Sequence, residues 1–256
     1  MQTLEIIKIG GKVIDDESAL HKMLQAVAQL PQPKILVHGG GSMASTLAGR
    51  LGITPVMVTG RRITDAAMLD VATMVYAGKI NKNVVATLQA YGCNALGLCG
   101  ADAAIIRAVK RPVGDIDYGF VGDIEQVNVD TISAFLEMGL TPVFSAITCQ
   151  LDGQLLNTNA DTLAATLAAS LAGQYAVRLT FVFEKAGVLD AKGKLIARLD
   201  KATFTRLKQE KVIADGMIPK LDNAFAALAA GVQTVRLASD IYLLNNKLPC
   251  TTLIAS

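Results

Sequence analysis

The chain has 256 residues, of which 52% are hydrophobic and 18% charged, so it can bury the core of a large globular protein and is not a disordered polypeptide. Its 24 basic and 22 acidic residues leave a net charge of +2 that is scattered along the chain, which argues against nucleic acid as the main partner. A small anionic ligand fits this charge pattern better.

Short runs of β-branched residues alternate with stretches rich in Ala and Leu, a pattern typical of a mainly parallel sheet with helices on both faces. The predicted strands are Leu4–Ile9, Lys34–His38, Asn94–Leu98, Thr141–Ser145, Ala176–Phe183, Val232–Arg236 and Thr251–Ile254. The predicted helices are Glu17–Gln29, Ser42–Leu51, Asp65–Tyr91, Asp130–Met138, Ala160–Leu171, Lys201–Lys211, Pro219–Ala230 and Ser239–Asn245. These elements predict an α/β fold.

One segment breaks the alternation. Between Ala101 and Asn128, Pro112 and several glycines stand among short β-like pieces, which predicts hairpins over one edge of the sheet. Such an insertion would be a natural lid or rim for a site. A boundary between two lobes is predicted near Gly173 and Gln174.

The sequence favours a cytosolic protein without a zinc site or a disulfide framework. Its four cysteines show no C-x-x-C spacing, and only two histidines are present to join them. No basic-then-apolar leader precedes the first strand, so secretion is not expected. The longest uncharged run, Thr162 to Val177, falls short of the roughly 20 apolar residues that a membrane span needs.

Two glycine-rich turns, each after a predicted strand, predict a phosphate-binding site. The first strand carries Lys8 and ends in Gly10 and Gly11, and the second is followed by a turn that contains Gly40 and Gly41. An apolar strand rarely contains a lysine unless an anion balances its charge, and glycines let backbone N–H groups approach such an anion closely. We infer that these groups hold a transferring phosphoryl group. A lysine that extends to solvent from a strand end is the alternative.

The usual motifs for phosphate binding and acyl transfer are absent. No Gly-Lys pair is followed by Ser or Thr, so there is no P-loop, and there is no G-x-G-x-x-G. The turn His38-Gly39-Gly40-Gly41 is similar to the loop that forms the oxyanion hole of some esterases. No serine of this chain lies in the G-x-S-x-G motif that such esterases need, so an esterase is not favoured. The H-R-D and D-F-G signatures of protein kinases are also absent.

The chain resembles the amino acid kinase family over nearly its whole length. Five motifs, in the order and approximate spacing of that family, carry the resemblance: Lys8-Ile9-Gly10-Gly11, His38-Gly39-Gly40-Gly41, Gly60-Arg61-Arg62-Ile63-Thr64, Leu156-Asn157-Thr158-Asn159-Ala160-Asp161 and Asp215-Gly216-Met217-Ile218-Pro219-Lys220. Each motif alone is weak, whereas five in register are specific.

The resemblance implies a three-layer α/β/α sandwich with a mainly parallel central sheet and two lobes. Residues 1–173 would bind an acylated amino acid and contain the glycine turns, and residues 174–256 would bind ATP. The implied reaction is ATP-dependent phosphorylation of the γ-carboxylate of N-acetyl-L-glutamate in arginine biosynthesis, with Mg²⁺ bound through the ATP phosphates. A glutamate side chain has a pKa of about 4.3 and is ionised at neutral pH, so its attack needs no general base. Lysines and N–H groups would stabilise the transition state.

Two further charged residues complete the predicted catalytic set with Lys8. Lys220 follows Pro219, which suits the first turn of a helix, and a lysine there opposes the helix dipole unless an anion is bound. We expect Lys220 to neutralise the leaving β-phosphate side. Asp161 begins an Ala-rich helix, where it could serve as a cap or a dipole partner. We also expect it to hold Lys8 and Lys220 in place by ion pairs.

The amino acid substrate has its own predicted partners. Arg62 offers a planar fork that can bind the α-carboxylate with two hydrogen bonds, while Arg61 is expected to be a solvated neighbour. Asn157 and Asn159 would project to one face if extended, and their amides can donate and accept around the α-carboxylate and acyl amide. Ordinary turn residues are the alternative for either. The predicted substrate-binding set is Gly40, Gly41, Arg62, Asn157 and Asn159.

The sequence departs from the family on the nucleotide side. Where the family usually has Ser-Asp-Val-x-Gly, this chain reads Phe183-Glu184-Lys185-Ala186-Gly187. The register is kept after Gly187, so ATP binding is still expected. The predicted ATP-binding set is Gly10, Gly11, Glu184, Lys185 and Gly187.

The sequence offers alternatives for the acyl group, the substrate and the assembly. Lys110 and Arg111 form a hypothetical site for a bulkier or anionic acyl group such as succinyl, and solvated hairpin charges are the alternative. His38 is expected to be structural.

The chain lacks the N-terminal helical extension of arginine-inhibited hexameric members, so we expect a homodimer without arginine feedback. N-succinyl-L-glutamate is an alternative substrate. So are the substrates of aspartate, carbamate, uridylate and glutamate kinases, and a non-catalytic ligand-binding module is a further alternative.

Overall fold

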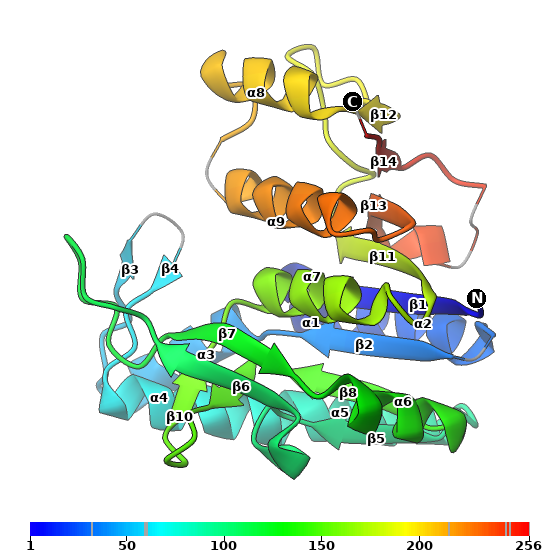
Figure 1. Ribbon diagram of the computed structural model, residues 1–256. Helices are drawn as coiled ribbons and strands as arrows, with labels where there is room; N and C mark the ends of the chain where they lie inside the picture. Colours follow the sequence, from blue (N-terminus) through cyan, green and yellow to red (C-terminus); the bar gives the residue numbers. More distant parts are fainter. Residues whose placement is uncertain (32, 59–60, 215, 244, 246, 256) are drawn as a thin grey trace.

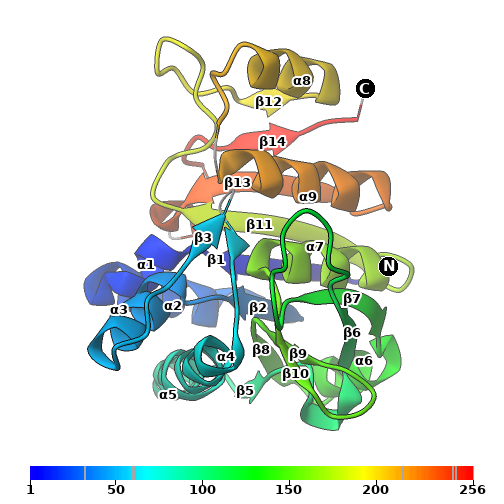
Figure 2. The ribbon, with the colours of Figure 1, turned by 90° about the vertical axis from the view of Figure 1, so that its left-hand side faces the viewer.

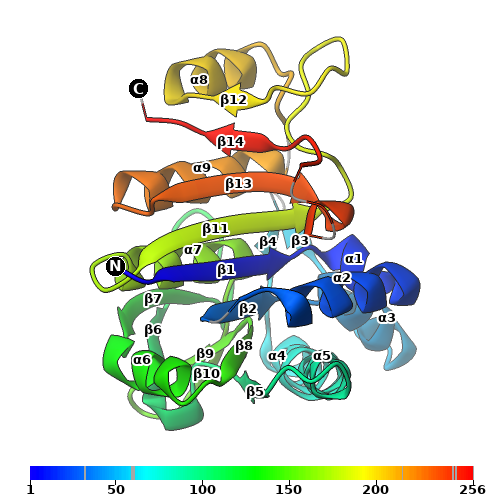
Figure 3. The same cartoon turned by 90° about the vertical axis from the view of Figure 1, so that its right-hand side faces the viewer.

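An eight-stranded sheet runs through the molecule, and its strands are stacked in Figure 3 from top to bottom. The computed structural model describes residues 1–31, 33–58, 61–214, 216–243, 245 and 247–255. In spatial order the strands are β12 (Arg198–Leu199), β14 (Thr251–Leu253), β13 (Thr234–Ser239), β11 (Ala176–Phe183), β1 (Thr3–Ile9), β2 (Lys34–His38), β8 (Thr141–Ser145) and β5 (Ala95–Leu98). Neighbouring strands are parallel except β13 and β14, which confirms the predicted mainly parallel α/β fold.

Helices cover both faces of this sheet. One face packs against α6 (Val129–Glu137), α7 (Ala160–Leu171), α8 (Lys201–Gln209) and α9 (Met217–Ala229). The other face packs against α1 (Gly11–Asp15), α2 (Glu17–Gln29), α3 (Gly41–Arg50), α4 (Ala66–Thr73), the π-helix η1 (Met74–Ile80) and α5 (Asn81–Ala90). In Figure 2, α7 and α9 lie in front of β11 and β13, and in the opposite view of Figure 3 they lie behind them.

The alternation of β1 decides which way Lys8 points. Successive side chains of a strand face opposite sides of a sheet. Leu4 and Ile6 pack into the core on the α7 side, while Ile7 and Ile9 pack into the core on the α2 side. Lys8 is therefore on the α7 side, at the carboxyl end of its strand.

A smaller sheet stands apart from the large one (Figure 1). Its strands are β10 (Leu155–Asn157), β9 (Ile147–Cys149), β6 (Ile106–Lys110) and β7 (Gly122–Val127). The predicted hairpin between 101 and 128 exists as the antiparallel pair β6 and β7, preceded by the short 3₁₀ turn η2 (Asp102–Ala104). It joins β9 and β10, two strands that the sequence did not predict, instead of lying over an edge of the large sheet. A further hairpin pairs β3 (Met57–Val58) with β4 (Arg61–Arg62).

Near the C-terminus one predicted helix was wrong, and one predicted strand has different limits. In the described part of the range Ser239–Asn245, the structure has the 3₁₀ turn η3 (Asp240–Leu243) instead of an α-helix, and Ser239 is still paired with Phe183 of β11. The strand expected over Val232–Arg236 runs over Thr234–Ser239, since pairing with β11 sets its limits. The helix expected over Asp65–Tyr91 is continuous but contains η1 in its middle.

The parallel pairing brings the two glycine turns to the same edge. Lys8 lies opposite Val37 of β2 and Phe181 of β11, so β1 and β2 end side by side. The predicted lobes share this sheet, because the pair β1 and β11 joins residues on both sides of position 173. No helix in the described part of the chain is long and apolar enough to cross a membrane.

Candidate active site

Three charged side chains meet where β1, α7 and α9 come together. Nζ of Lys8 lies 2.8 Å from Oδ1 of Asp161, and Nζ of Lys220 lies 2.8 Å from Oδ2 of the same carboxylate. The three side chains are only 10%, 14% and 12% exposed for Lys8, Asp161 and Lys220. Asp161 and Lys220 both lie in the first turn of their helices, where N–H groups favour anions. These are the two ion pairs expected from the sequence.

The three groups form an anion-attracting cluster. Burial would raise the pKa of Asp161, but the ammonium groups of Lys8 and Lys220 lower it to about 2. Burial lowers the pKa of Lys220, and the neighbouring charge of Lys8 adds to this effect. With both lysines protonated and Asp161 ionised, the cluster carries a net positive charge. Phosphate oxygens are suitable ligands for such a cluster.

The glycine turns end β1 and β2 and begin α1 and α3. Gly10 and Gly40 are the residues before the two helices, and Gly11 and Gly41 are their first residues. The N–H of Gly10 donates to the carbonyl of Val182 at 2.8 Å, so it is engaged before any ligand binds. The N–H groups at the start of a helix have no intrahelical partner, which leaves Gly11 and Gly41 as the better donors for an anion.

Gly40 must be a glycine because the π-helix packs against it. Its φ of 154° is one that other residues rarely adopt, and a side chain there would collide with Ile80 and Tyr76 of η1. A π-helix inserts an extra residue into the turn, and such turns are common at functional sites. Here η1 brings Tyr76 and Ile80 under the second glycine turn.

His38, the last residue of β2, is fully buried and supports the same turn. Its Nδ1 donates to the carbonyl of Gly39 at 2.9 Å, and its Nε2 accepts from Nδ2 of Asn81 at 3.1 Å. Burial lowers the pKa of His38 to about 4, so the ring is neutral at pH 7. This fits the expected structural role. Asn81, the first residue of α5, was not predicted from the sequence.

Arg62 is fixed by contacts with the second glycine turn and α3. Its Nη2 donates to the carbonyl of Gly41 at 2.8 Å and to Oγ of Ser45 at 2.7 Å. The side chain of Arg62 also hydrogen-bonds Tyr76, whose pKa is raised by burial and moderated by this neighbouring charge. A guanidinium held in this way can meet a carboxylate without losing much further freedom.

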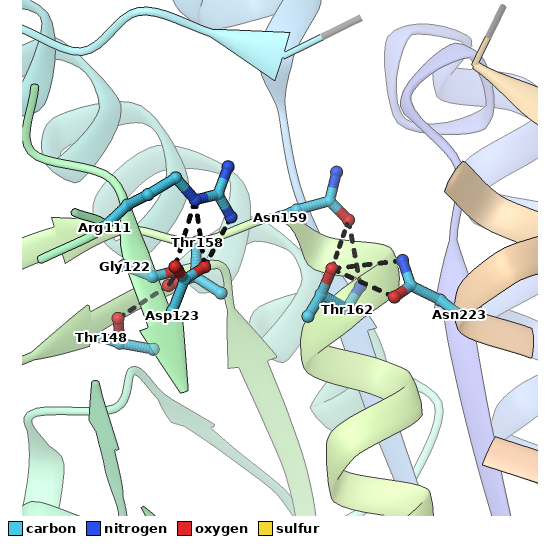
Figure 4. A network of polar contacts seen from close by, with 8 residues as sticks. All are labelled: Arg111, Gly122, Asp123, Thr148, Thr158, Asn159, Thr162 and Asn223. Atoms are coloured by element: carbon cyan, nitrogen blue, oxygen red, sulfur yellow. Dashed lines mark hydrogen bonds and ion pairs between the residues drawn. The ribbon is translucent and has the colours of Figure 1, made fainter. Parts of the chain in front are cut away.

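The two asparagines have different local partners. Asn157 ends β10, and its Nδ2 donates to Oγ1 of Thr64 at 3.0 Å. Asn159 is the N-cap of α7, and its Oδ1 accepts from the N–H groups of Asp161 and Thr162 at 2.9 and 3.0 Å (Figure 4). The cap of α7 is therefore Asn159, and Asp161 contributes as a dipole partner and ion-pair acceptor.

A cavity of about 220 Å³ opens between these groups. Its lining includes the following residues predicted from the sequence: Lys8, Gly11, Gly40, Gly41, Arg62, Asn157, Asn159 and Asp161. It also includes residues without a predicted role, among them Met57, Arg61, Tyr76, Val121 and Thr158. Arg61 therefore lies at the cavity and is not merely a solvated neighbour. Tyr76 had no recognisable signal, because it comes from the interior of a long helical pattern.

Arg111 and Lys110 differ in position. Arg111 lines the cavity, and its Nε lies 3.1 Å from Oδ2 of Asp123 (Figure 4). Lys110 is exposed, lies 5.1 Å above the ring of Phe120, and borders a different hollow on the outer side of β6. Only one of the two residues is placed to meet a ligand in this cavity.

The predicted nucleotide contacts do not line this cavity. Glu184 and Lys185 are exposed, and Glu184 pairs with Lys12 at 3.0 Å across the start of α1. Gly187 is buried with a φ of 159°, and a side chain there would collide with Thr251 of β14. It therefore anchors the loop after β11. Gly60 and Asp215, which begin two of the five motifs, lie outside the described residues.

Known proteins resemble this chain in sequence and in fold. The model of the amino acid kinase family matches residues 3–239. The chain is 47% identical to the acetylglutamate kinase of Parabacteroides distasonis, over 94% of this chain and 97% of the relative. It is 48% identical to the acetylglutamate kinase of Cytophaga hutchinsonii over the full length of both. Among solved structures, smu.665 from Streptococcus mutans UA159 superposes with a TM-score of 0.80 at 26% identity, covering 99% of each chain.

Replacing Asp161 with asparagine should destabilise the protein by about 3 kcal/mol at neutral pH, because two largely buried lysines lose their counter-charge. Because the pKa of Asp161 is lowered to about 2, below the unfolded value of about 3.9, its contribution is complete above the unfolded pKa. The contribution is lost as the pH falls through about 2. Urea denaturation of both proteins from neutral to acidic pH measures this difference.

Asp222→Asn is the matched control. Asp222 also contacts two lysines, Lys201 at 3.4 Å and Lys208 at 3.5 Å, but these side chains are about half exposed. Its replacement should change the free energy of unfolding by less than about 0.5 kcal/mol. Equal losses in the two variants, or a difference that does not shrink in acid, would contradict the role given to Asp161.

Proposed function

The chain belongs to the amino acid kinase family, and we propose that it is the enzyme that transfers the γ-phosphoryl group of ATP to the γ-carboxylate of N-acetyl-L-glutamate. The product, N-acetyl-L-glutamyl 5-phosphate, is an intermediate of arginine biosynthesis. High identity over the full length of named acetylglutamate kinases favours this substrate over those of the sibling kinases.

The observation that carries the mechanism is the pair of lysines held by Asp161 beside the glycine turns. The attacking γ-carboxylate is ionised at neutral pH, so no proton needs to be removed. What opposes the reaction is repulsion between this carboxylate and the phosphates, together with charge on the transferring group. Lys8, Lys220 and the N–H groups of Gly11 and Gly41 would reduce both effects by meeting that charge with fixed donors.

The two substrates would approach from different sides of the cluster. Arg62, Asn157 and Asn159 line the cavity and would bind the acylated amino acid, with Gly40 and Gly41 at the acceptor end. Lys220 contacts Asp161 from α9, which belongs to residues 174–256. This contact supports the proposal that ATP binds on that side of the cluster. Glu184 and Lys185, which are exposed on the loop after β11, would then contact the nucleotide beyond its phosphates, while Gly187 would hold that loop in place and Gly10 would allow the first turn to pack against β11.

A magnesium ion would be held through the ATP phosphates. Asp161 is the one carboxylate among the described residues that line the cavity, and it already accepts from two lysines. Among the described residues, no three or more His, Cys, Asp or Glu side chains lie close enough together to hold a metal ion. When bound, Mg²⁺ would neutralise phosphate charge, and the protein's part is to hold the phosphates and the acceptor carboxylate in line.

Acyl-phosphate formation, trapped by hydroxylamine, tests the proposal directly. With ATP, Mg²⁺ and N-acetyl-L-glutamate, the natural protein should form the hydroxamate, and Lys8→Ala should lower the rate by at least about 100-fold. Lys22→Ala, at an exposed site on α2, is the matched control and should keep the natural rate. Turnover of aspartate, carbamate, UMP or free glutamate instead would support a sibling activity, and ATP binding without any turnover would support a binding module.

The position of Arg111 favours a second candidate substrate, N-succinyl-L-glutamate. Asp123 contacts the edge of the guanidinium formed by Nε and Nη2, so the remaining edge could bind the additional carboxylate of a succinyl group. Arg111 lines the same cavity as Arg62, which would bind the α-carboxylate. An acetyl group has no carboxylate to offer Arg111. Among the described residues, the carboxylate that contacts Arg111 is that of Asp123.

Replacing Arg111 tests this alternative. If the acyl group is succinyl, Arg111→Gln should raise the KM for N-succinyl-L-glutamate by about tenfold or more and change the KM for N-acetyl-L-glutamate much less. Lys110→Gln, one residue away but outside the cavity, should change neither value. Equal effects of Arg111→Gln on the two substrates would remove the succinyl alternative.

We further propose a homodimer in the cytoplasm. The four cysteines are free thiols, as expected in a reducing compartment. β5 lies at one end of the sheet, and Met74, the first residue of η1, is 53% exposed and borders a hollow between the end of α4 and the turn before β10. An edge strand and an exposed apolar side chain are features that a second copy could cover.

Light scattering should give twice the chain mass of 26.9 kDa for the natural protein. Met74→Asp should shift the measured mass toward the monomer, because it places a charge in the proposed interface. Ile241→Asp is the control, since Ile241 is 50% exposed on η3, which follows β13 and not the edge strand β5. A monomeric natural protein, or equal effects of the two variants, would count against this interface.

A further inference from the structure

A second polar contact joins α7 to α9 beside the pair of Asp161 and Lys220. Nδ2 of Asn223 lies 3.1 Å from Oγ1 of Thr162 (Figure 4). Thr162 directly follows Asp161 in the first turn of α7, and Asn223 lies one turn after Lys220 on the same face of α9, so the two contacts lie next to each other. The helix that carries Lys220 therefore touches the start of α7 twice.

The direction of these hydrogen bonds can be assigned. A hydroxyl has one proton to donate, and Oγ1 of Thr162 has an acceptor at 3.4 Å in Asn159 and another at 3.4 Å in Asn223. The shorter contact, 3.1 Å, is the one in which the Asn223 amide donates to the hydroxyl. The hydroxyl proton is then free to go to Oδ1 of Asn159. The amide of Asn223 therefore donates to the hydroxyl of Thr162, and this hydroxyl donates to the amide oxygen of Asn159.

Two backbone N–H groups of α7 fix which end of the Asn159 amide faces the cavity, and the Thr162 hydroxyl adds a third, longer contact. Oδ1 of Asn159 accepts from two backbone N–H groups of α7 as well as from the Thr162 hydroxyl, so this atom must be the oxygen. Figure 4 shows the Nδ2 of Asn159 directed away from α7. Asn159 lines the cavity, so it presents hydrogen-bond donors to a ligand there.

We propose that Asn223 is a positioning residue that acts through Thr162 to hold the Asn159 amide as a donor for an oxygen of the acylated amino acid. This inference rests on the proposed function, because it takes that amino acid as the ligand of the cavity. It means that α9, which carries Lys220 on the ATP side, also sets one contact on the amino acid side. A shift of α9 would disturb phosphate neutralisation and substrate binding together.

The experiment measures binding by calorimetry in the absence of ATP, so that turnover is not needed. The ligands are N-acetyl-L-glutamate and N-succinyl-L-glutamate, and the better one is used for the variants. Asn223→Ala and Thr162→Val should each weaken binding by about fivefold, because the Asn159 amide loses part of its support. Thr162→Ser keeps the hydroxyl and should stay within about twofold of the natural protein. Asp222→Asn, next to Asn223 but exposed, should not change binding.

The decisive comparison uses Asn159→Ala. If Asn223 acts through Asn159, the double variant Asn159→Ala/Asn223→Ala should bind no more than about 1.5-fold more weakly than Asn159→Ala alone. A merely structural role of Asn223 would weaken binding by the same factor in both backgrounds. Thermal unfolding of each variant checks that the fold is kept.

Three results would overturn the inference: multiplicative effects in the double variant, natural affinity in Asn223→Ala, or failure of Thr162→Ser to restore binding. The proposed function fails in a different way. In that case the natural protein itself would bind neither acylated glutamate, and the assignment of Asn159 to this ligand would fall with it. Binding by the natural protein with additive variants rejects the inference alone.

Discussion

The carboxylate of Asp161 is the constraint on which the site depends. Lys8 comes from β1 and Lys220 from α9, and two largely buried ammonium groups would repel each other if no anion lay between them. Asp161 can hold both because it lies in the first turn of α7, between the strand and the helix, where backbone N–H groups also favour its charge. The low pKa of Asp161 follows from this arrangement, and so does the net positive charge that remains for a ligand.

The backbone contributes positive ends to the same place. α1 and α3 begin at the cavity because they follow the parallel strands β1 and β2, whose carboxyl ends lie at one edge of the large sheet. α7, which follows β10 of the smaller sheet, begins at the same cavity. The close packing of these turns restricts which residues can occupy them. Position 40 must be a glycine because the π-helix packs against it, and buried, neutral His38 hydrogen-bonds the turn and Asn81. A site built from helix N-termini and lysines can stabilise phosphoryl charge without a titrating base, which agrees with a chain that has only two histidines.

Much of the fold and part of the site follow from the sequence, because the relevant signals are local. β2, β8 and β11 have the predicted limits, and Lys8, Gly11, Gly40 and Gly41 were predicted from the sequence to lie at one site and line the same cavity. What sequence reasoning missed depends on long-range contacts. The amide of Gly10 is taken by Val182 of a strand far along the chain, and Tyr76 reaches the cavity only through a π-helix inside an ordinary helical pattern. The limits of β13 were likewise set by its neighbour β11, and no local preference of its own residues could have given them.

The distribution of charge around the cavity limits which ligands can complete it. Lys8, Arg61 and Arg62 line it as cations, whereas Asp161 is the one carboxylate of its described lining. A neutral ligand would leave these cations partly desolvated without new partners, which is costly. A ligand with a fixed α-carboxylate and a γ-carboxylate that approaches a phosphoryl group supplies anions at both ends. Arg111 differs, because Asp123 already balances it. In the proposed binding mode, an acyl group beside Arg111 therefore meets a cation whose charge is already balanced, so either a neutral acetyl group or the extra carboxylate of a succinyl group can be accommodated there.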